Sequence, residues 1–211
     1  QTALAAAIVL GLSGCTSQEV GRAGFFASEP APGAADSAPI PLESLTTARL
    51  DPGAAPLMLA TMGDGAPVTS LSRQIAEDGV SVWSSPEGMR LTLRDGLIAE
   101  TENLDTDLVA VDPPARIEAL SGTRYLRAYH HDSGPTVTVT TFDCAMRDGG
   151  EEEIEILDRR LRARKMEESC EGPGGQRIAN AYWLGDDGTM WRSRQWVSAE
   201  LGTIEMQRLI R

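Results

Sequence analysis

From residue 57 onward, apolar and polar positions alternate along the chain in short runs. Alternation places successive side chains on opposite faces of a strand, so each run predicts a half-buried β-strand. Gly, Pro and Asp separate the runs and favour tight turns. Short strands at regular spacing predict an all-β fold with a large antiparallel sheet, forming a barrel or a sandwich, because both architectures have this alternation. The expected strands are 57–61, 68–76, 80–84, 90–94, 96–101, 123–130, 136–146, 180–184, 190–197 and 203–210.

Local signals refine this pattern at two points. Residues 42–50 predict one short N-terminal helix, with Glu43 near its start and Asp51-Pro52-Gly53 at its end. Asp95-Gly96 predicts a two-residue turn between the strands that flank it, since Asp and Gly accept left-handed backbone conformations.

A charged hairpin is expected between residues 153 and 164. With Asp158-Arg159 as its turn, one face carries acids opposite arginines and the other face is apolar. Opposed unlike charges contribute about 0.2–1 kcal/mol per pair, so they set the register more than the stability. The alternative is a basic ligand site on Arg160, Arg162 and Arg164, which the neighbouring acidic strand disfavours. The expected pairs are Glu155 with Arg162, Glu153 with Arg164, Ile156 with Leu161, and Ile154 with Ala163.

The N-terminal residues match an export signal. Residues 3–12 form an uncharged, mostly apolar run that is too short for a bilayer span of about 20 residues. Leu12-Ser13-Gly14-Cys15 then gives an apolar residue, two small residues and a cysteine, which is similar to the bacterial lipoprotein signal. A fortuitous cysteine after an Ala-rich tail is the alternative. Because the chain opens on Gln1 and lacks a basic n-region, we interpret residues 1–14 as a truncated signal peptide.

This interpretation predicts how the mature protein is held. Cys15 is expected to be lipidated, and several acyl chains on one residue anchor it stably in a bilayer, at about 0.8 kcal/mol per buried methylene. The residue after Cys15 is Thr16 and not Asp. By analogy with Gram-negative lipoproteins, this leaves the default route to the outer membrane open. Residues 15–41, rich in Ala, Gly, Ser and Pro, predict a flexible tether that spans on the order of 28 Å as a random coil. Residues 42–211 form the predicted β domain.

Charge narrows the classes of partner. The chain carries a formal net charge of -12, and its sequence pI is about 4.6. Nucleic acid, or an anionic glycan held by broad electrostatics, needs a basic surface and is therefore disfavoured. No nucleic-acid partner is expected.

Two cysteines remain besides Cys15, namely Cys144 and Cys170. In an exported protein two such cysteines most simply pair, and closing a loop of about 25 residues stabilises by about 3–4 kcal/mol in the chain-entropy model. A metal site is the competing interpretation, but no His or further Cys lies nearby in the sequence. The sequence therefore favours a disulfide over a metal site.

Candidate catalytic groups are few. Asp186 and Asp187 lie between two glycines and are interpreted first as turn residues. His130 and His131 are adjacent, so a strand would point them to opposite faces, and the run into Ser133-Gly134-Pro135 favours a surface loop. The sequence contains no phosphate-binding glycine loop after a strand and no dinucleotide fingerprint. We therefore expect neither catalysis nor a cofactor.

Three tryptophans gather in the last third of the chain. Trp183, Trp191 and Trp196 offer flat apolar faces on which a sugar ring stacks, but core packing of at least two of them is favoured. Alternation puts Arg194 on the strand face of Trp196, where it would stack on the ring or hold a buried carboxylate. A glycan or partner contact is expected, if anywhere, at these four residues.

A wider pattern joins four segments of the second half of the chain. They are Phe142-Asp143-Cys144, Glu168-Ser169-Cys170, Asn180-Ala181-Tyr182-Trp183 and Trp191-Arg192-Ser193-Arg194-Gln195-Trp196-Val197. In order, spacing and identity they resemble the YjbF/GfcB family of exopolysaccharide and group 4 capsule lipoproteins. Residues 96–101, followed by Leu104 and Asp107-Leu108, are similar to that family's middle motif, although Glu102-Asn103 stands where a glycine is expected before the leucine. Asn tolerates a left-handed conformation almost as Gly does.

The resemblance implies an outer-membrane lipoprotein with a large antiparallel β fold, facing the periplasm and encoded with genes for an extracellular polysaccharide. It also implies an outer-membrane β-barrel partner, which such operons encode. The family supplies no catalytic residues to carry over. The first hypothesis is a lipid-anchored, non-enzymatic accessory protein that docks to the barrel partner. The second is a periplasmic protein that binds or modifies the polysaccharide itself.

Overall fold

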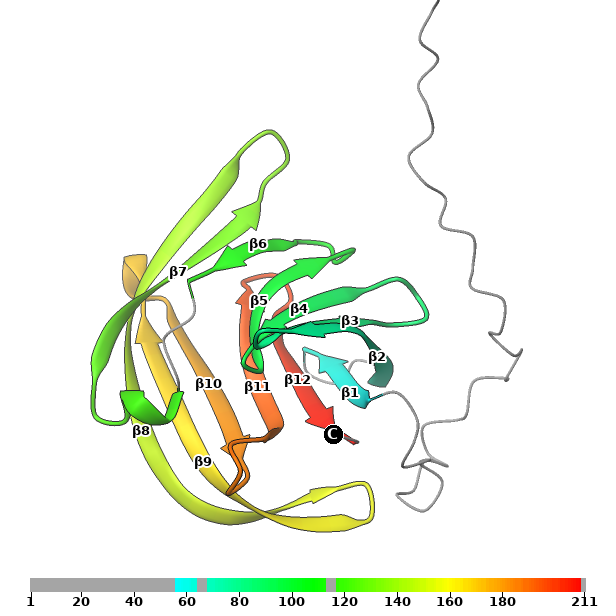
Figure 1. The fold of residues 1–211 in the computed structure, drawn as a ribbon. Helices are drawn as coiled ribbons and strands as arrows, with labels where there is room; N and C mark the ends of the chain where they lie inside the picture. The colour runs from blue at the N-terminus through cyan, green and yellow to red at the C-terminus, as the bar shows by residue number, and fades with distance from the viewer. Residues whose placement is uncertain (1–55, 64–67, 113–116, 210–211) are drawn as a thin grey trace, which may run out of the picture. The chain divides into compact units, whose positions relative to one another are not determined.

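Twelve antiparallel strands form one sheet in the computed structural model (Figure 1), which describes residues 56–63, 68–112 and 117–209. The sheet order is β5-β4-β3-β2-β1-β12-β11-β10-β9-β8-β7-β6, so the chain meanders up and down and β1 pairs with β12. The strands are β1 Leu57–Met62, β2 Val68–Glu77, β3 Val80–Ser84, β4 Arg90–Arg94, β5 Leu97–Glu102, β6 Leu108–Val111, β7 Arg124–Asp132, β8 Val137–Ile156, β9 Arg159–Glu171, β10 Arg177–Leu184, β11 Met190–Ser198 and β12 Gly202–Arg208.

The sheet curves into a nearly closed barrel whose seam lies between β5 and β6 (Figure 1). Side chains join these edges, because the Leu108 N–H donates to Thr101 Oγ1 at 2.8 Å and the Thr101 hydroxyl donates to Asp107 at 3.1 Å. Asp107 also accepts the backbone N–H groups of Asn103 and Leu104, at 3.0 and 3.1 Å. Asn103 has a φ of 64°, the left-handed conformation that Asn was expected to tolerate. Of the two architectures left open by the sequence, the structure is the barrel.

Side chains fill the barrel interior, as they do in other small barrels. Gln195 on β11 reaches across it to β5, where its Oε1 accepts the Ile98 N–H at 2.9 Å and its Nε2 donates to the Gly96 carbonyl at 3.0 Å. This side chain thereby satisfies backbone groups of an edge strand. The largest fully buried apolar side chains include Trp83, Tyr129, Tyr182, Phe142, Leu71 and Leu91.

The hairpin of β8 and β9 extends beyond the barrel wall and curves beneath β10, β11 and β12 (Figure 1). It contributes to a separate apolar cluster with residues of β10, β11 and the end of the chain. Its buried members are Ile154, Ile156, Ala163, Trp183, Trp191 and Leu209, and Leu57, Leu59 and Leu157 pack against them. The long hairpin is therefore held by a second core of its own.

The hairpin's register differs from the sequence-based prediction by two residues. The turn is formed by residues 157 and 158, and Leu157 takes a φ of 56°. A left-handed conformation is unfavourable for Leu, but here the side chain packs into the second core, which offsets the strain. The observed pairs are Glu155 with Arg160, Ile154 with Leu161, Glu153 with Arg162, and Glu151 with Arg164.

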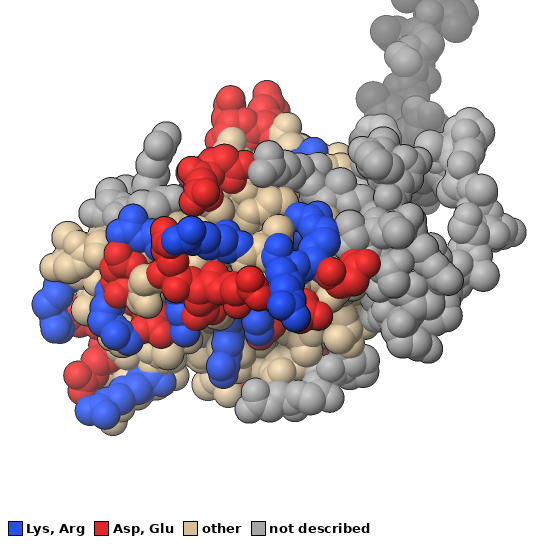
Figure 2. Space-filling view, turned by 90° about the horizontal axis from the view of Figure 1, so that it is seen from below, with Lys and Arg blue, Asp and Glu red and all other residues tan. Residues whose placement is uncertain are grey.

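The predicted separation of a charged and an apolar face is nevertheless present. Arg160 lies 3.6 Å from Glu153, Arg162 pairs with Glu151, and Arg164 pairs with Asp148. Seen from below, basic and acidic side chains are interleaved (Figure 2). Each arginine of the alternative basic ligand site thus has an acidic partner, and such exposed pairs contribute at most about 1 kcal/mol each.

Most of the expected strands are confirmed, and two features were not anticipated. β6 was missed, and β8 is a single strand where two were expected, although its bulge at Gly149-Gly150, which shifts the register with β9, agrees with the bulge or loop that the two glycines allow. The Asp95-Gly96 turn is confirmed, with φ values of 50° and 85°. The helix expected at 42–50 lies outside the described residues. Within them the helical elements are two 3-10 turns, Ile117–Leu120 and Pro173–Gly175, and neither could cross a membrane.

Candidate functional site

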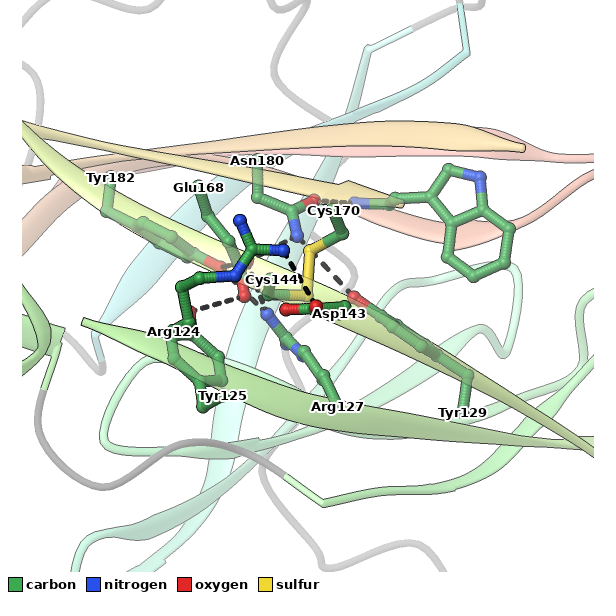
Figure 3. The surroundings of a disulfide bond; sticks show 11 residues. Arg124, Tyr125, Arg127, Tyr129, Asp143, Cys144, Glu168, Cys170, Asn180 and Tyr182 are labelled. Carbon is green, nitrogen blue, oxygen red and sulfur yellow. Dashed lines mark hydrogen bonds and ion pairs between the residues drawn. A yellow bond between two sulfur atoms is a disulfide. The ribbon is translucent and has the colours of Figure 1, made fainter. Parts of the chain in front are cut away.

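A buried carboxylate lies at the centre of the most polar part of the barrel interior. Glu168 on β9 is 1% exposed, and it shares the inward face of that strand with Met166 and Cys170. Its Oε2 accepts from Arg127 Nη1 at 2.6 Å, and its Oε1 accepts from the Tyr125 hydroxyl at 2.7 Å. Strands β7 and β9 therefore meet at one ionised group, and two residues of β10 also reach it (Figure 3).

The partners from β10 complete the cage around this carboxylate. Tyr182 donates its hydroxyl to Glu168 Oε2 at 2.7 Å, and Asn180 Nδ2 donates to the same oxygen at 2.6 Å. The side-chain oxygen of Asn180 accepts the backbone N–H of Trp196 at 2.6 Å. The amide thus joins the buried charge to the backbone of β11.

The pKa values follow from burial and from this pairing. Burial disfavours the charged form of Glu168, but Arg127 and the donated hydrogen bonds outweigh it, so the pKa of Glu168 lies below its ordinary value. Burial likewise raises the pKa of Tyr129, to about 12, and raises that of Tyr182 well above its ordinary value. The centre is therefore an ionised carboxylate surrounded by neutral phenols and one guanidinium.

The predicted disulfide lies beside this network. Cys144 on β8 and Cys170 on β9 are directly opposite each other, with an S–S distance of 2.04 Å and both residues buried. Figure 3 shows the bond among the residues of the network. The two sulfurs and a Glu168 oxygen lie within 4.8 Å of one another, a spacing that a metal would need. Both sulfurs are consumed by the disulfide, so neither is a thiolate ligand here.

The network around Glu168 stabilises the fold and presents no reactive group to a solute. Arg127 and Glu168 are each 1% exposed, so neither meets a solute while the barrel is intact. A buried ion pair is tolerated when further hydrogen bonds satisfy its remaining atoms, and here three donors besides Arg127 satisfy the Glu168 oxygens, while Arg127 Nε is buried without a partner in the described part of the chain. The network fixes how β7, β9 and β10 pack.

The structure does not bring the three predicted tryptophans into one platform. Trp183 and Trp191 are each 7% exposed and belong to the second core beneath the hairpin. Trp196 packs instead against the barrel interior, with ring centroids 4.8 Å from Tyr129 and 5.5 Å from Phe142. All three rings pack in or against a core, which the sequence favoured over a sugar-stacking platform.

The expected role of Arg194 is not observed. Arg194 is exposed, and its Nε is 3.4 Å from Thr203 Oγ1. Arg192, two residues away on the same face, lies over the Trp183 ring at 4.9 Å. The buried carboxylate expected near an arginine does exist, but Arg127 holds it.

Replacing Trp196 and Arg194 separately distinguishes a core role from a surface role. We expect Trp196→Ala to lower the free energy of unfolding by about 2–4 kcal/mol, because it empties space beside Tyr129 and Phe142. Arg194→Ala should change it by less than about 0.5 kcal/mol. Urea denaturation followed by fluorescence measures both. Equal, small effects would place the Trp196 ring on the surface.

The remaining candidate residues are two histidines, which lie on a strand, and two aspartates, which lie in a turn. His130 and His131 lie on strand β7 and not in the surface loop that was expected, because the turn to β8 comes after Asp132. They point to opposite faces, as predicted: His131 Nε2 contacts the Val197 carbonyl at 2.6 Å, and His130 lies 3.9 Å from Asp112. Asp186 and Asp187 lie in the β10–β11 turn.

The network was not predicted, because each of its charged members taken alone resembles a solvated charge. Glu168 follows Glu167, and Arg127 lies in a strand with other polar residues. A signal was available, since Glu168 shares its alternation with Met166 and Cys170, and Arg127 lies two residues from each of two tyrosines. A charge at an inward position of a strand indicates a buried partner.

Fold and site together define an all-β barrel filled by its own side chains, with a disulfide next to an internal ion pair. The chain belongs to the group 4 capsule polysaccharide lipoprotein family (gfcB, YjbF), whose model matches residues 41–209. Membership implies a membrane-anchored lipoprotein, and the family is not one of known enzymes. Three of the four segments that resembled this family supply Phe142, Cys144, Glu168, Cys170, Asn180 and Tyr182 to the buried region.

One of the solved structures with a similar fold is that of a bacterial lipoprotein. It is the crystal structure of the hypothetical lipoprotein YmcC from Escherichia coli K12, with a TM-score of 0.66 and 18% sequence identity. The match covers 74% of this chain and 84% of that chain. At this identity the likeness concerns the fold. No curated protein sequence matches this chain.

Proposed function

We propose that this protein is a lipid-anchored, non-enzymatic accessory protein for production or export of an extracellular polysaccharide. It acts at the periplasmic face of the outer membrane, anchored through acylated Cys15, and docks to an outer-membrane β-barrel protein of the same operon. The observation that carries the proposal is the family match over residues 41–209, together with the Leu12-Ser13-Gly14-Cys15 signal.

Two features of the β domain support an accessory role. The ionised groups brought together in the interior are sealed from solvent, as expected of a scaffold and not of a catalytic site. The outward face of the β7–β8 hairpin carries Leu126, Val137 and Val139 with 72%, 53% and 52% exposure. Apolar side chains this exposed are suited to contact with a protein partner.

Site-specific crosslinking in intact cells tests the docking. A photoreactive residue at Val139 should crosslink to an outer-membrane β-barrel protein, and one at Arg162, on the charged hairpin, should not. Replacing Cys15 by Ala should abolish metabolic labelling with a fatty acid and release the protein from the membrane fraction. A chain that carries no acyl group, or Val139 crosslinks that contain no barrel protein, would contradict the proposal.

The second candidate is direct binding of the polysaccharide. The observation that favours it is a pair of inward-facing arginines, Arg73 on β2 and Arg208 on β12, which line one cavity at an end of the barrel. Glycan binding by purified protein, without recovery of a barrel partner, would support this function over the first.

A further inference from the structure

A cavity of about 450 Å³ lies where three turns of the barrel meet. The turns join β2 to β3, β4 to β5 and β10 to β11, and residues 78–79, 95–96 and 188–189 of these turns line the cavity. Its volume falls within the range of small-molecule sites, and the mouth of a β-barrel is a common place for one. Residues of β2, β3, β11 and β12 line the rest of it.

Two arginines point into the barrel at this end. Arg73 is opposite Trp83 in the β2–β3 register, and Arg208 is opposite Met58 in the β1–β12 register. Trp83 and Met58 are buried core residues. Both guanidinium groups lie over the Trp83 ring, at 6.0 Å and 5.8 Å from its centroid, and both arginines line the cavity.

Within the described part of the chain, neither guanidinium has a carboxylate within ion-pair distance. The Nε of Arg208 is moreover buried without a hydrogen-bond partner. Burial first, and then the nearby charge of Arg73, lower the pKa of Arg208. This pairing of like charges contrasts with the charged hairpin, where Arg160, Arg162 and Arg164 all meet acids. Two cations that have no counter-ion among the described residues and lie beside one cavity would be stabilised by an anion from outside.

A hydroxyl completes the set of donors. Ser81 lines the cavity, and its Oγ accepts the Trp83 indole N–H at 2.9 Å. Because the oxygen is already used as an acceptor, the Ser81 proton is directed toward another acceptor. A carboxylate placed between Arg73, Arg208 and Ser81 would meet both charges and this proton.

The rim of the cavity restricts the ligand further. Glu77, Asp78 and Asp95 line it and present acceptors only. They repel a polyanion but accept hydrogen bonds from hydroxyl groups. A ligand with one carboxylate at one side and several hydroxyls at the other matches this distribution of charge.

We propose that this cavity binds a single sugar residue that bears a carboxylate, as in a uronic acid. The carboxylate lies against Arg73 and Arg208, and the ring hydroxyls face the acidic rim. The net charge of the protein opposes a broad field for anionic glycans, so recognition is confined to this local pair. The anion site stands on the geometry alone, whereas the choice of a sugar as its carrier rests on the proposed role in polysaccharide production.

Calorimetric titration of the full chain in detergent tests the site with three probes, namely sodium glucuronate, glucose and sodium sulfate. We expect glucuronate to bind, and glucose, which lacks the carboxylate, to bind at least about tenfold more weakly. Arg208→Gln and Arg73→Gln should each weaken glucuronate binding by about tenfold or more. The matched control is Arg177→Gln, which removes the same charge at the other end of β10 and should leave the affinity unchanged.

Each outcome bears on a different part of the proposal. Absence of glucuronate binding at millimolar concentration overturns the site. Sulfate that binds as tightly as glucuronate, and is lost in Arg208→Gln, supports the anion site but overturns the sugar and leaves the docking function standing. Since the arginines pack on Trp83, Arg208→Lys provides a variant that keeps the charge. Weakened glucuronate binding with an unchanged melting temperature in Arg208→Lys supports direct contact, and unchanged binding opposes it.

Discussion

Glu168→Gln is expected to lower the free energy of unfolding by about 3–5 kcal/mol, a large fraction of the stability of a domain of this size. The amide removes the negative charge and leaves the buried guanidinium of Arg127 without a counter-ion, 1% exposed to water. It also converts an acceptor of four donated hydrogen bonds into a group that must donate at one end, toward Tyr125, Tyr182 or Asn180. Urea denaturation at neutral pH measures the loss.

The control for this prediction is an ion pair of the same kind on the surface. Arg162 and Glu151 are joined on the hairpin, with side-chain exposures of 76% and 54%. Glu151→Gln should cost less than about 1 kcal/mol. A double-mutant cycle of Arg127→Met with Glu168→Gln should give a coupling free energy of more than about 2 kcal/mol. If Glu168→Gln behaves like Glu151→Gln, the interior carboxylate is not the element that orders the barrel.

The same group predicts a dependence of stability on pH. The pKa of Glu168 is lowered in the folded state, so its charged form contributes stability above the unfolded value, and this contribution is lost as the pH falls through the folded pKa. The loss should begin below about pH 4.5, the ordinary value for Glu. Asp148 and Glu167 have lowered pKa values as well, so the informative quantity is the difference between the wild type and Glu168→Gln. That difference should shrink as the pH falls.

The alternation of apolar and polar residues predicted the strands well, because in each half-buried strand every second side chain faces the core. It failed where an element is too short to show a period, as in β6, which has four residues. The prediction failed again at the turn of the β8–β9 hairpin, because turn preferences favour Asp158-Arg159 over Leu157-Asp158. The left-handed conformation of Leu157 is explained by its packing in the cluster that contains Trp183 and Trp191, which are distant in sequence. Closure as a barrel depends on the pairing of β1 with β12, the first and last described strands, which no local pattern encodes.

The interior site was only partly predictable for a related reason. The cysteine pair followed from counting, because few partners were available. The ion pair of Arg127 and Glu168 joins residues 41 apart in sequence, and each taken alone resembles a solvated charge. The arginines at the barrel mouth are further apart still, so their proximity depends on the closure of the sheet. Sequence patterns find groups on one strand, whereas these groups are assembled by pairing between strands.

Removing the disulfide is the second change with a large expected effect. Replacing Cys144 and Cys170 by Ala, or reducing the bond, should lower the free energy of unfolding by about 3–4 kcal/mol. The chain-entropy model gives about this value for a bridge between residues 26 apart. Reduction of the wild type separates the loss of the bond from the loss of sulfur volume, because the reduced thiols still fill their places. Denaturation with and without dithiothreitol measures it.

The two predicted losses should not simply add. Cys170 and Glu168 lie on the same face of β9, and both fix how β8 and β9 pack against β7 and β10. The disulfide restricts the unfolded chain, whereas the ion pair acts in the folded barrel, so reduction should leave the coupling between Arg127 and Glu168 intact if the register of the strands survives without the bond. A coupling that disappears on reduction would mean that the bond itself positions Glu168. An oxidising compartment would then be a condition for forming the interior network, and not merely for stabilising it.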